Sequence, residues 1–198
     1  MDADRRRSLN EKKERLQQLL TFKKYSEQHI KPWLLIYREL LERNIKPEVH
    51  YLASSFDLDP DLLRQAVDEL LEEDQKSLLD KIITTEVLPV HDKMDEYYPS
   101  SNPIRYMPES EKIVSDENSE AMIRQAMDEL SIPEQTCFVL YPVYSAVMEL
   151  PLSDIITNCD IIIEPMTDVC IIAKDYSWII FHSLEEEWVW RKQSIETD

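Results

Sequence analysis

Hydrophobic positions in the first 85 residues recur mostly at the spacing of an α-helix. Residues 8–29 carry apolar side chains at a roughly helical period, with lysine and glutamate between them. Residues 33–43 form a second apolar stripe behind Pro32, which suits the first turn of a helix. Pro47 predicts a short third helix through Ala53, and Asp59-Pro60 predicts a fourth that runs towards Ile83. The pattern therefore predicts a helical region over residues 1–85.

The spacing changes over residues 86–112, where four prolines occur among tyrosine, serine and asparagine. Such a composition is typical of a linker or a crossover segment between two folded parts. A fifth helix is expected from about Asp116 to Leu130, capped by Ser115 or Asp116 and ended by Pro133. We take residues 86–112 as the boundary between the helical region and a second domain.

After residue 135 the apolar runs become short and rich in valine, isoleucine and aromatic residues, which is typical of strands. Strands are predicted over residues 136–141, 145–150, 169–173, 178–182 and 187–191. The last three are separated by turn-length segments and fit an antiparallel meander, and residues 151–158 fit a short helix. The sequence thus predicts an α+β fold, in which residues 113–198 form a small, mainly antiparallel sheet packed with helices.

Charge divides the 198-residue chain differently from the apolar pattern. Its 40 acidic and 22 basic residues give a net charge of −18, but residues 1–50 hold 12 basic and 8 acidic side chains. Residues 51–198 hold 10 basic and 32 acidic ones, a net of −22. A surface of this sign repels phosphate backbones and anionic lipids, so we expect a protein partner with a basic surface rather than nucleic acid. We find no apolar run long enough for a signal peptide or a membrane span.

The chain has no glycine. Loops that cradle phosphate need glycine, because their backbone takes positive φ angles and approaches the ligand closely. The P-loop, the dinucleotide-binding fingerprint, the kinase loop and the G-x-S-x-G nucleophile elbow are therefore absent from this sequence. This absence excludes whole classes of enzyme but not every enzyme, and an unrecognised hydrolase with a carboxylate or metal site is an alternative. We predict a protein that is not an enzyme and that needs no cofactor.

Few residues offer catalytic or metal-binding chemistry. His182, Ser183 and Asp175 could be imagined as a triad, but adjacent strand residues point to opposite faces of a sheet. The four histidines and three cysteines are not paired at metal-ligand spacing, so no metal site is predicted. The cysteines lie in apolar contexts, which indicates buried, reduced thiols and a cytoplasmic protein.

Two other interpretations start from the N-terminal half. Residues 49–71 have the outline of a helix-turn-helix, and Arg5-Arg6-Arg7 with Lys12-Lys13 could form the contact arm of a regulator that binds nucleic acid. The acidic second helix opposes that reading, because it would face phosphate. A phage-type anti-defence protein that mimics the charge of DNA is a further alternative. The segment 8–29 could also be a dimerisation arm.

The C-terminal aromatic block is the candidate partner-binding site. Strand alternation places Trp178, Ile180 and His182 on one face of the sheet, and two further tryptophans share a face on the next strand. If this face is covered by helices it is core, and if it is open it is a binding surface with an acidic rim. The candidate residues are Trp178, Trp188, Trp190, Glu185, Glu186 and Glu187.

The segment from Cys137 to Arg191 resembles small bacterial domains of uncharacterised function, some of the immunity-protein type that neutralises toxins. The residues that carry the resemblance are the strand Cys137-Phe-Val-Leu-Tyr and the hairpin segment Asp168-Val-Cys-Ile-Ile-Ala-Lys-Asp-Tyr-Ser-Trp178. Those domains often have His-Glu and a glycine where this chain has Ser183-Leu184-Glu185. The resemblance covers about a quarter of the chain, implies an α+β fold and an inhibitory role, and carries over no functional residues. We therefore expect an acidic immunity or inhibitor protein.

Overall fold

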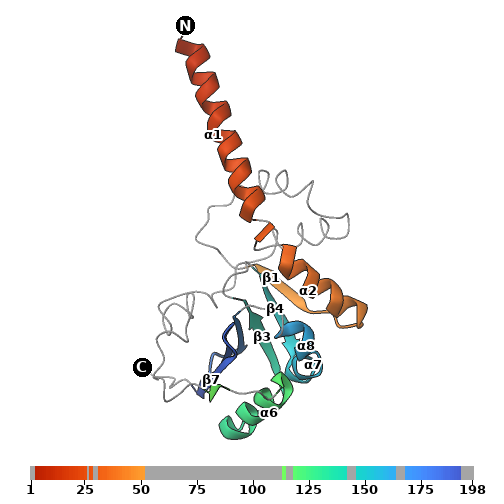
Figure 1. The fold of residues 1–198 in the computed structure, drawn as a ribbon. Coiled ribbons are helices and arrows are strands. Elements are labelled where there is room, and N and C mark those ends of the chain that lie inside the picture. Colours follow the sequence, from red (N-terminus) through yellow and green to blue (C-terminus); the bar gives the residue numbers. More distant parts are fainter. Residues whose placement is uncertain are drawn as a thin grey trace.

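The computed structural model describes residues 3–25, 27–28, 31–51, 113–114, 118–141, 146–163 and 168–192. These residues form an α+β fold in which helices pack on a seven-stranded sheet, as the sequence predicts (Figure 1). The helices are α1 (Ala3–Tyr25), α2 (Lys31–Glu42), α6 (Ser119–Leu130), α7 (Leu152–Thr157) and α8 (Cys159–Ile162). The strands are β1 (Glu48–Tyr51), β2 (Ile113–Val114), β3 (Thr136–Leu140), β4 (Ala146–Pro151), β5 (Val169–Ala173), β6 (Trp178–His182) and β7 (Glu187–Lys192).

The strands lie in the order β1-β4-β3-β5-β6-β7-β2, and every neighbouring pair is antiparallel. The predicted meander is confirmed as β5-β6-β7, with His182 opposite both Val169 and Trp188. The two strands that come first in the sequence, β1 and β2, lie at opposite edges of the sheet. The proposed boundary at residues 86–112 and the predicted fourth helix lie outside the described residues.

The predicted third helix is wrong where the structure describes it, because residues 48–51 form strand β1. Glu48 lies opposite Glu149 and Tyr51 lies opposite Ala146 on β4. A proline can precede an edge strand as readily as a helix, and pairing with β4 decides between the two. Strand β1 therefore occupies the predicted start of the helix-turn-helix, and residues 52–71 of that motif lie outside the described residues.

Helix α6 begins later than predicted. Asn118 is its N-cap, and the Asn118 side chain accepts a hydrogen bond from the backbone N–H of Ala121 at 2.9 Å. Neither Ser115 nor Asp116 caps it. The C-cap is Ser131, whose φ of 52° is left-handed and whose N–H donates to the carbonyls of Asp128 and Met127. Serine thus takes the position that glycine fills at many helix ends.

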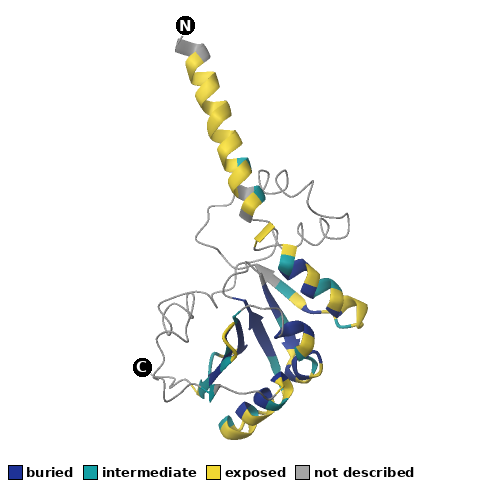
Figure 2. Ribbon diagram, in the orientation of Figure 1, coloured by how far each residue is buried: buried dark blue, intermediate teal, exposed yellow. Residues whose placement is uncertain are grey.

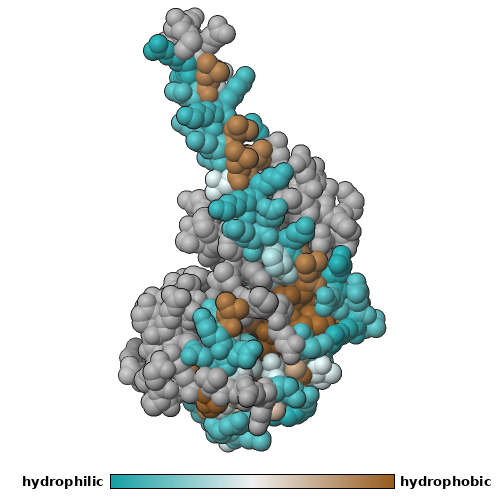
Figure 3. Space-filling view, viewed as in Figure 1, coloured by the Kyte–Doolittle hydropathy of each residue, from teal (hydrophilic) through white to brown (hydrophobic). Residues whose placement is uncertain are grey.

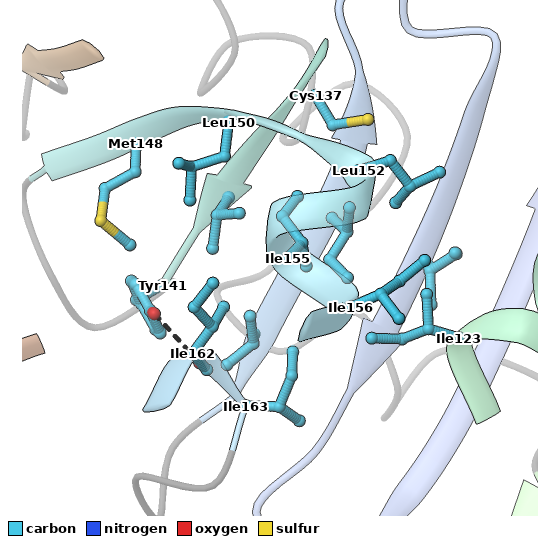
Figure 4. Close-up of a cluster of buried hydrophobic side chains, with 14 of the residues drawn as sticks. Ile123, Cys137, Tyr141, Met148, Leu150, Leu152, Ile155, Ile156, Ile162 and Ile163 are labelled. Atoms are coloured by element: carbon cyan, nitrogen blue, oxygen red, sulfur yellow. Dashed lines mark hydrogen bonds between the residues drawn. The ribbon is translucent and has the colours of Figure 1, made fainter. Parts of the chain in front are cut away.

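The main core lies between the sheet and helices α2, α6, α7 and α8. Figure 4 shows Ile155 and Ile156 of α7 together with Ile162 and Ile163 facing the side chains of the sheet. The phenol of Tyr141 is fully buried and donates a hydrogen bond to the carbonyl of Ile162 at 3.0 Å. This bond satisfies a hydroxyl that would otherwise be costly to bury.

The other face of the sheet is apolar as well. Its alternate strand positions form a second cluster that is buried in the folded chain: Phe138, Leu140, Val147, Cys170, Ile172, Ile179, Phe181 and Val189. A strand that is buried on both faces has a nearly continuous run of hydrophobic residues in its sequence. Strands β3, β5 and β6 have such sequences. Figure 2 shows this buried sheet in contrast with α1, whose described side chains are almost all exposed.

Candidate functional site

The tryptophans of the predicted binding block face the helices. Trp178 and Trp188 are 3% and 2% exposed and belong to the main core. Trp190 is partly buried beside that core, and its indole N–H donates to Glu129 of α6 at 2.8 Å. Two of the three predicted aromatic residues are thus core residues with almost no surface to offer a partner. Of the two alternatives left open by the sequence, the helix-covered face is the one observed.

Of the acidic residues of the block, Glu185 and Glu186 lie in the turn between β6 and β7, whereas Glu187 is partly buried and begins β7. The turn is organised around Ser183. The hydroxyl of Ser183 accepts hydrogen bonds from the backbone N–H groups of Glu185 and Glu187, each at 3.2 Å. The N–H of Ser183 donates to the carbonyl of Glu187 at 2.9 Å, and the N–H of Glu186 donates back to the carbonyl of Ser183 at 3.0 Å. Ser183 is itself fully buried. This network fixes the conformation of the turn.

A further hydrogen bond joins the turn to Asp168, the residue before β5, because the N–H of Leu184 donates to Asp168 at 3.0 Å. Glu186 has a φ of 61°, a left-handed conformation that costs a non-glycine residue about 1 kcal/mol or more. The tip of the turn therefore holds Glu185 and Glu186 exposed, beside Leu184 with 53% of its surface accessible. We call residues 184–186 the acidic turn. The acidic turn is an outward-facing surface, held by these hydrogen bonds, that combines two negative charges with one hydrophobic side chain.

Helix α6 contacts β7. It also carries negative charge. Asp128 and Glu129 are exposed on α6. The pKa of Glu129 is lowered by hydrogen bonds from Gln125 and from Trp190, so its carboxylate is ionised at neutral pH. The sequence pattern did not indicate that Leu184 is exposed in this turn, that buried Ser183 holds the turn, or that Glu129 accepts from Trp190. One signal for Leu184 was available, since it is an apolar residue inside a predicted turn.

The imagined triad does not assemble. Asp175 lies in the turn before β6 and Ser183 lies just after it, so the whole five-residue strand separates them by about 17 Å. Asp175 instead accepts the backbone N–H of Ser177 at 3.0 Å, and hydrogen bonds from the side chain and then the backbone of Ser177 lower the pKa of its carboxyl group. Desolvation lowers the pKa of His182 to about 4, so its imidazole is neutral at pH 7.

The thiols are also poorly suited to nucleophilic chemistry. Cys137 and Cys170 are buried and free, and Cys159 is partly buried. Burial raises the pKa of Cys137 to about 12, with a smaller contribution from Glu134, and burial raises that of Cys170 well above its usual value. A thiol of such pKa is protonated at neutral pH and does not act as a thiolate.

Within the described ranges, no group of three or more histidine, cysteine or acidic residues could hold a metal ion. A shallow hollow of about 350 Å³ on α1 is lined by Glu14, Gln17, Gln18 and Thr21, which include neither a base beside a nucleophile nor a set of metal ligands. No described helix is long and apolar enough to cross a membrane. Comparison with protein-family models, with curated proteins and with solved structures found no match.

Proposed function

We propose that this protein is a non-enzymatic binding protein whose acidic turn docks on a basic surface of another protein. The observation that carries the proposal is the construction of residues 184–186, where buried Ser183 and Asp168 hold two exposed glutamates and an exposed leucine in one conformation. A surface ordered before binding loses less conformational entropy when a partner docks. Glutamates around an apolar contact are suited to a partner that presents lysine or arginine around an apolar residue.

The charge of the whole chain supports the same interpretation. The net charge of −22 over residues 51–198 favours encounter with a basic protein and disfavours nucleic acid. The resemblance of residues 137–191 to immunity-type domains points to an inhibitory role, in which docking masks the basic functional surface of the partner. Buried, free thiols suit the reducing cytoplasm.

Affinity capture from the host at low and high salt tests the proposal. We would compare the wild-type chain with Glu185→Lys/Glu186→Lys and with the matched control Glu39→Lys/Glu42→Lys, which makes the same change of charge on exposed positions of α2. We expect the wild type and the control to capture a basic protein. The turn variant should no longer capture it. For the isolated pair, the dissociation constant should rise by about 10- to 100-fold, because two complementary contacts become repulsive.

Two outcomes of this experiment would remove the proposal. One is a captured protein that binds the turn variant and the wild type equally well, because the turn would then lie outside the interface. The other is the absence of any salt-sensitive partner at low ionic strength, because surface charge attraction is strongest there.

A further inference from the structure

Helix α1 carries an apolar stripe that is left exposed. Leu9, Leu16 and Leu20 are 52%, 58% and 59% exposed. On a helix of 3.6 residues per turn these three positions lie within about 40° of one another. Figure 3 shows apolar side chains along α1 that are set among hydrophilic ones. The stripe therefore has the spacing of a packing face without being packed.

Basic side chains flank the stripe on both sides. Around the same helix, Arg6 and Lys13 lie on one side of the leucines and Lys12 lies on the other, and all three are exposed. Glu11 and Glu14 lie on the opposite side of α1, where Glu11 pairs with Arg7 at 3.1 Å. We call Leu9, Leu16, Leu20, Arg6, Lys12 and Lys13 the basic leucine face.

The chemistry of this face selects an acidic protein surface over a lipid surface. A helix that lies in a membrane interface needs a broad apolar face with its bases on the polar side. Among the described side chains of α1, Leu9, Leu16 and Leu20 form a narrow exposed stripe, and the bases stand directly beside it. A narrow stripe with flanking charges is suited instead to a protein contact that is apolar at its centre and acidic at its rim.

The acidic turn has the complementary arrangement. It presents one exposed leucine, Leu184, next to two exposed carboxylates, Glu185 and Glu186. Within one chain α1 does not cover this turn, because the three leucines of α1 and Leu184 are each more than half exposed. Helix α1 instead extends away from the body (Figure 1). The arm is about 35 Å long and is free to meet another molecule.

We propose that the basic leucine face of one copy docks on the acidic turn of a second copy. Each molecule has one arm and one turn, so two reciprocal contacts close a symmetric dimer. The inference rests on the proposed function, because it assigns a regulator to the same turn. Self-association covers Glu185 and Glu186, and a basic partner protein must displace the arm in order to bind.

Sedimentation velocity of the full-length protein over a range of concentrations, at low and high salt, tests this assembly. We expect a dimer at low salt that dissociates as salt is added, since the contact is largely between exposed charges. Lys12→Glu/Lys13→Glu should weaken the dimer roughly tenfold or more. Arg7→Glu/Arg15→Glu makes the same change of net charge on the other side of α1, and it should leave the dimer in place.

Charge exchange provides the specific test of pairing. Glu185→Lys/Glu186→Lys alone should also dissociate the dimer, and combining it with Lys12→Glu/Lys13→Glu should restore assembly. A wild type that stays monomeric at all concentrations overturns the inference, as does a dimer that Lys12→Glu/Lys13→Glu leaves intact. Equal loss in both α1 variants would make net charge the cause and would overturn the assignment to this face.

The basic leucine face could instead bind a lipid membrane or DNA, and each alternative predicts a distinct experimental result. Binding of anionic phosphatidylserine vesicles or of a short DNA duplex that depends on Lys12 and Lys13, in a chain that remains monomeric, would overturn the dimer. The proposed function is tested separately by asking whether the Lys12→Glu/Lys13→Glu variant captures a basic partner protein. If that chain captures the partner through the acidic turn while the wild type never dimerises, only the present inference fails.

Discussion

Helices α1 and α2 follow each other in the sequence, and both show an apolar stripe, but the two stripes meet different surroundings. In α2 the stripe includes Trp33, Ile36 and Leu40, which are at most 5% exposed and pack in the main core. In α1 the stripe leucines Leu9, Leu16 and Leu20 remain more than half exposed. The residues beside the stripes distinguish the two cases, because the exposed stripe of α1 is lined with lysine and arginine. A helical apolar stripe alone indicates a packing face, and its flanking charges indicate which partner it suits.

The largest expected effect on the free energy of unfolding distinguishes the body, meaning the sheet with helices α2, α6, α7 and α8, from the arm α1. Trp188→Ala should lower the free energy of unfolding by about 3 to 5 kcal/mol, because it leaves a large cavity between the sheet and the helices. Leu16→Ala on α1 should change it by less than about 0.5 kcal/mol, since that side chain is already exposed. Urea denaturation of both variants measures the difference. Similar losses in the two variants would show that α1 is packed as tightly as the sheet.

A smaller effect should come from the buried hydroxyl of the body. Tyr141→Phe removes the donor to the carbonyl of Ile162 and leaves that carbonyl buried without this partner. We expect a loss of about 1 to 2 kcal/mol in the free energy of unfolding. Thermal and urea denaturation should agree on the loss. A variant as stable as the wild type would mean that this hydrogen bond adds nothing to the core.

The sequence predicted the body better than its edges. Strands β5 and β6 have the predicted ends, because turn residues bound their apolar runs on both sides. Alternation also put Trp178 on the correct face, although alternation cannot say what covers that face. Strand β1 was missed, since four residues carry too little local signal against pairing with a distant strand. The acidic turn depends on Asp168 accepting the N–H of Leu184, 16 residues further along the chain, and spacing in sequence does not reveal such a contact.

The pH dependence of stability tests the packing around His182. Its pKa of about 4 in the folded protein lies below the ordinary value of 6.5, so the folded state favours the neutral imidazole. The stabilisation is complete above pH 6.5 and is lost as the pH falls from 6.5 towards 4. A shift of this size corresponds to roughly 3 kcal/mol, and since the side chain is only partly buried we expect about 1 kcal/mol.

Urea midpoints measured at several pH values for the wild type and for His182→Gln check this expectation. The wild type should lose more stability than His182→Gln between pH 6.5 and 4. The lowered pKa values of Glu129 and Asp160 reduce stability at the acidic end of this window and below it, but they do so in both proteins alike, so the difference between the two curves reports His182. Parallel curves for the two proteins in this window would assign the loss to other groups.

The smallest expected effect concerns folding of the arm variants. Lys12→Glu/Lys13→Glu should change the free energy of unfolding of the monomer by less than about 0.5 kcal/mol, because both side chains are exposed. High-salt urea denaturation measures this change without contribution from assembly. A large loss would show that these lysines support the fold of the chain, and the comparison of arm and body would then need revision.

The complementarity of the two regions is tested most directly by zero-length carbodiimide cross-linking of a mixture of ¹⁴N- and ¹⁵N-labelled full-length protein. This reagent joins lysine amines only to carboxylates with which they are in contact. The account predicts mixed-isotope cross-links between Lys12 or Lys13 of one copy and Glu185 or Glu186 of another. Cross-links from these lysines to other parts of the body, or none between copies under conditions where the protein sediments as a dimer, would contradict it.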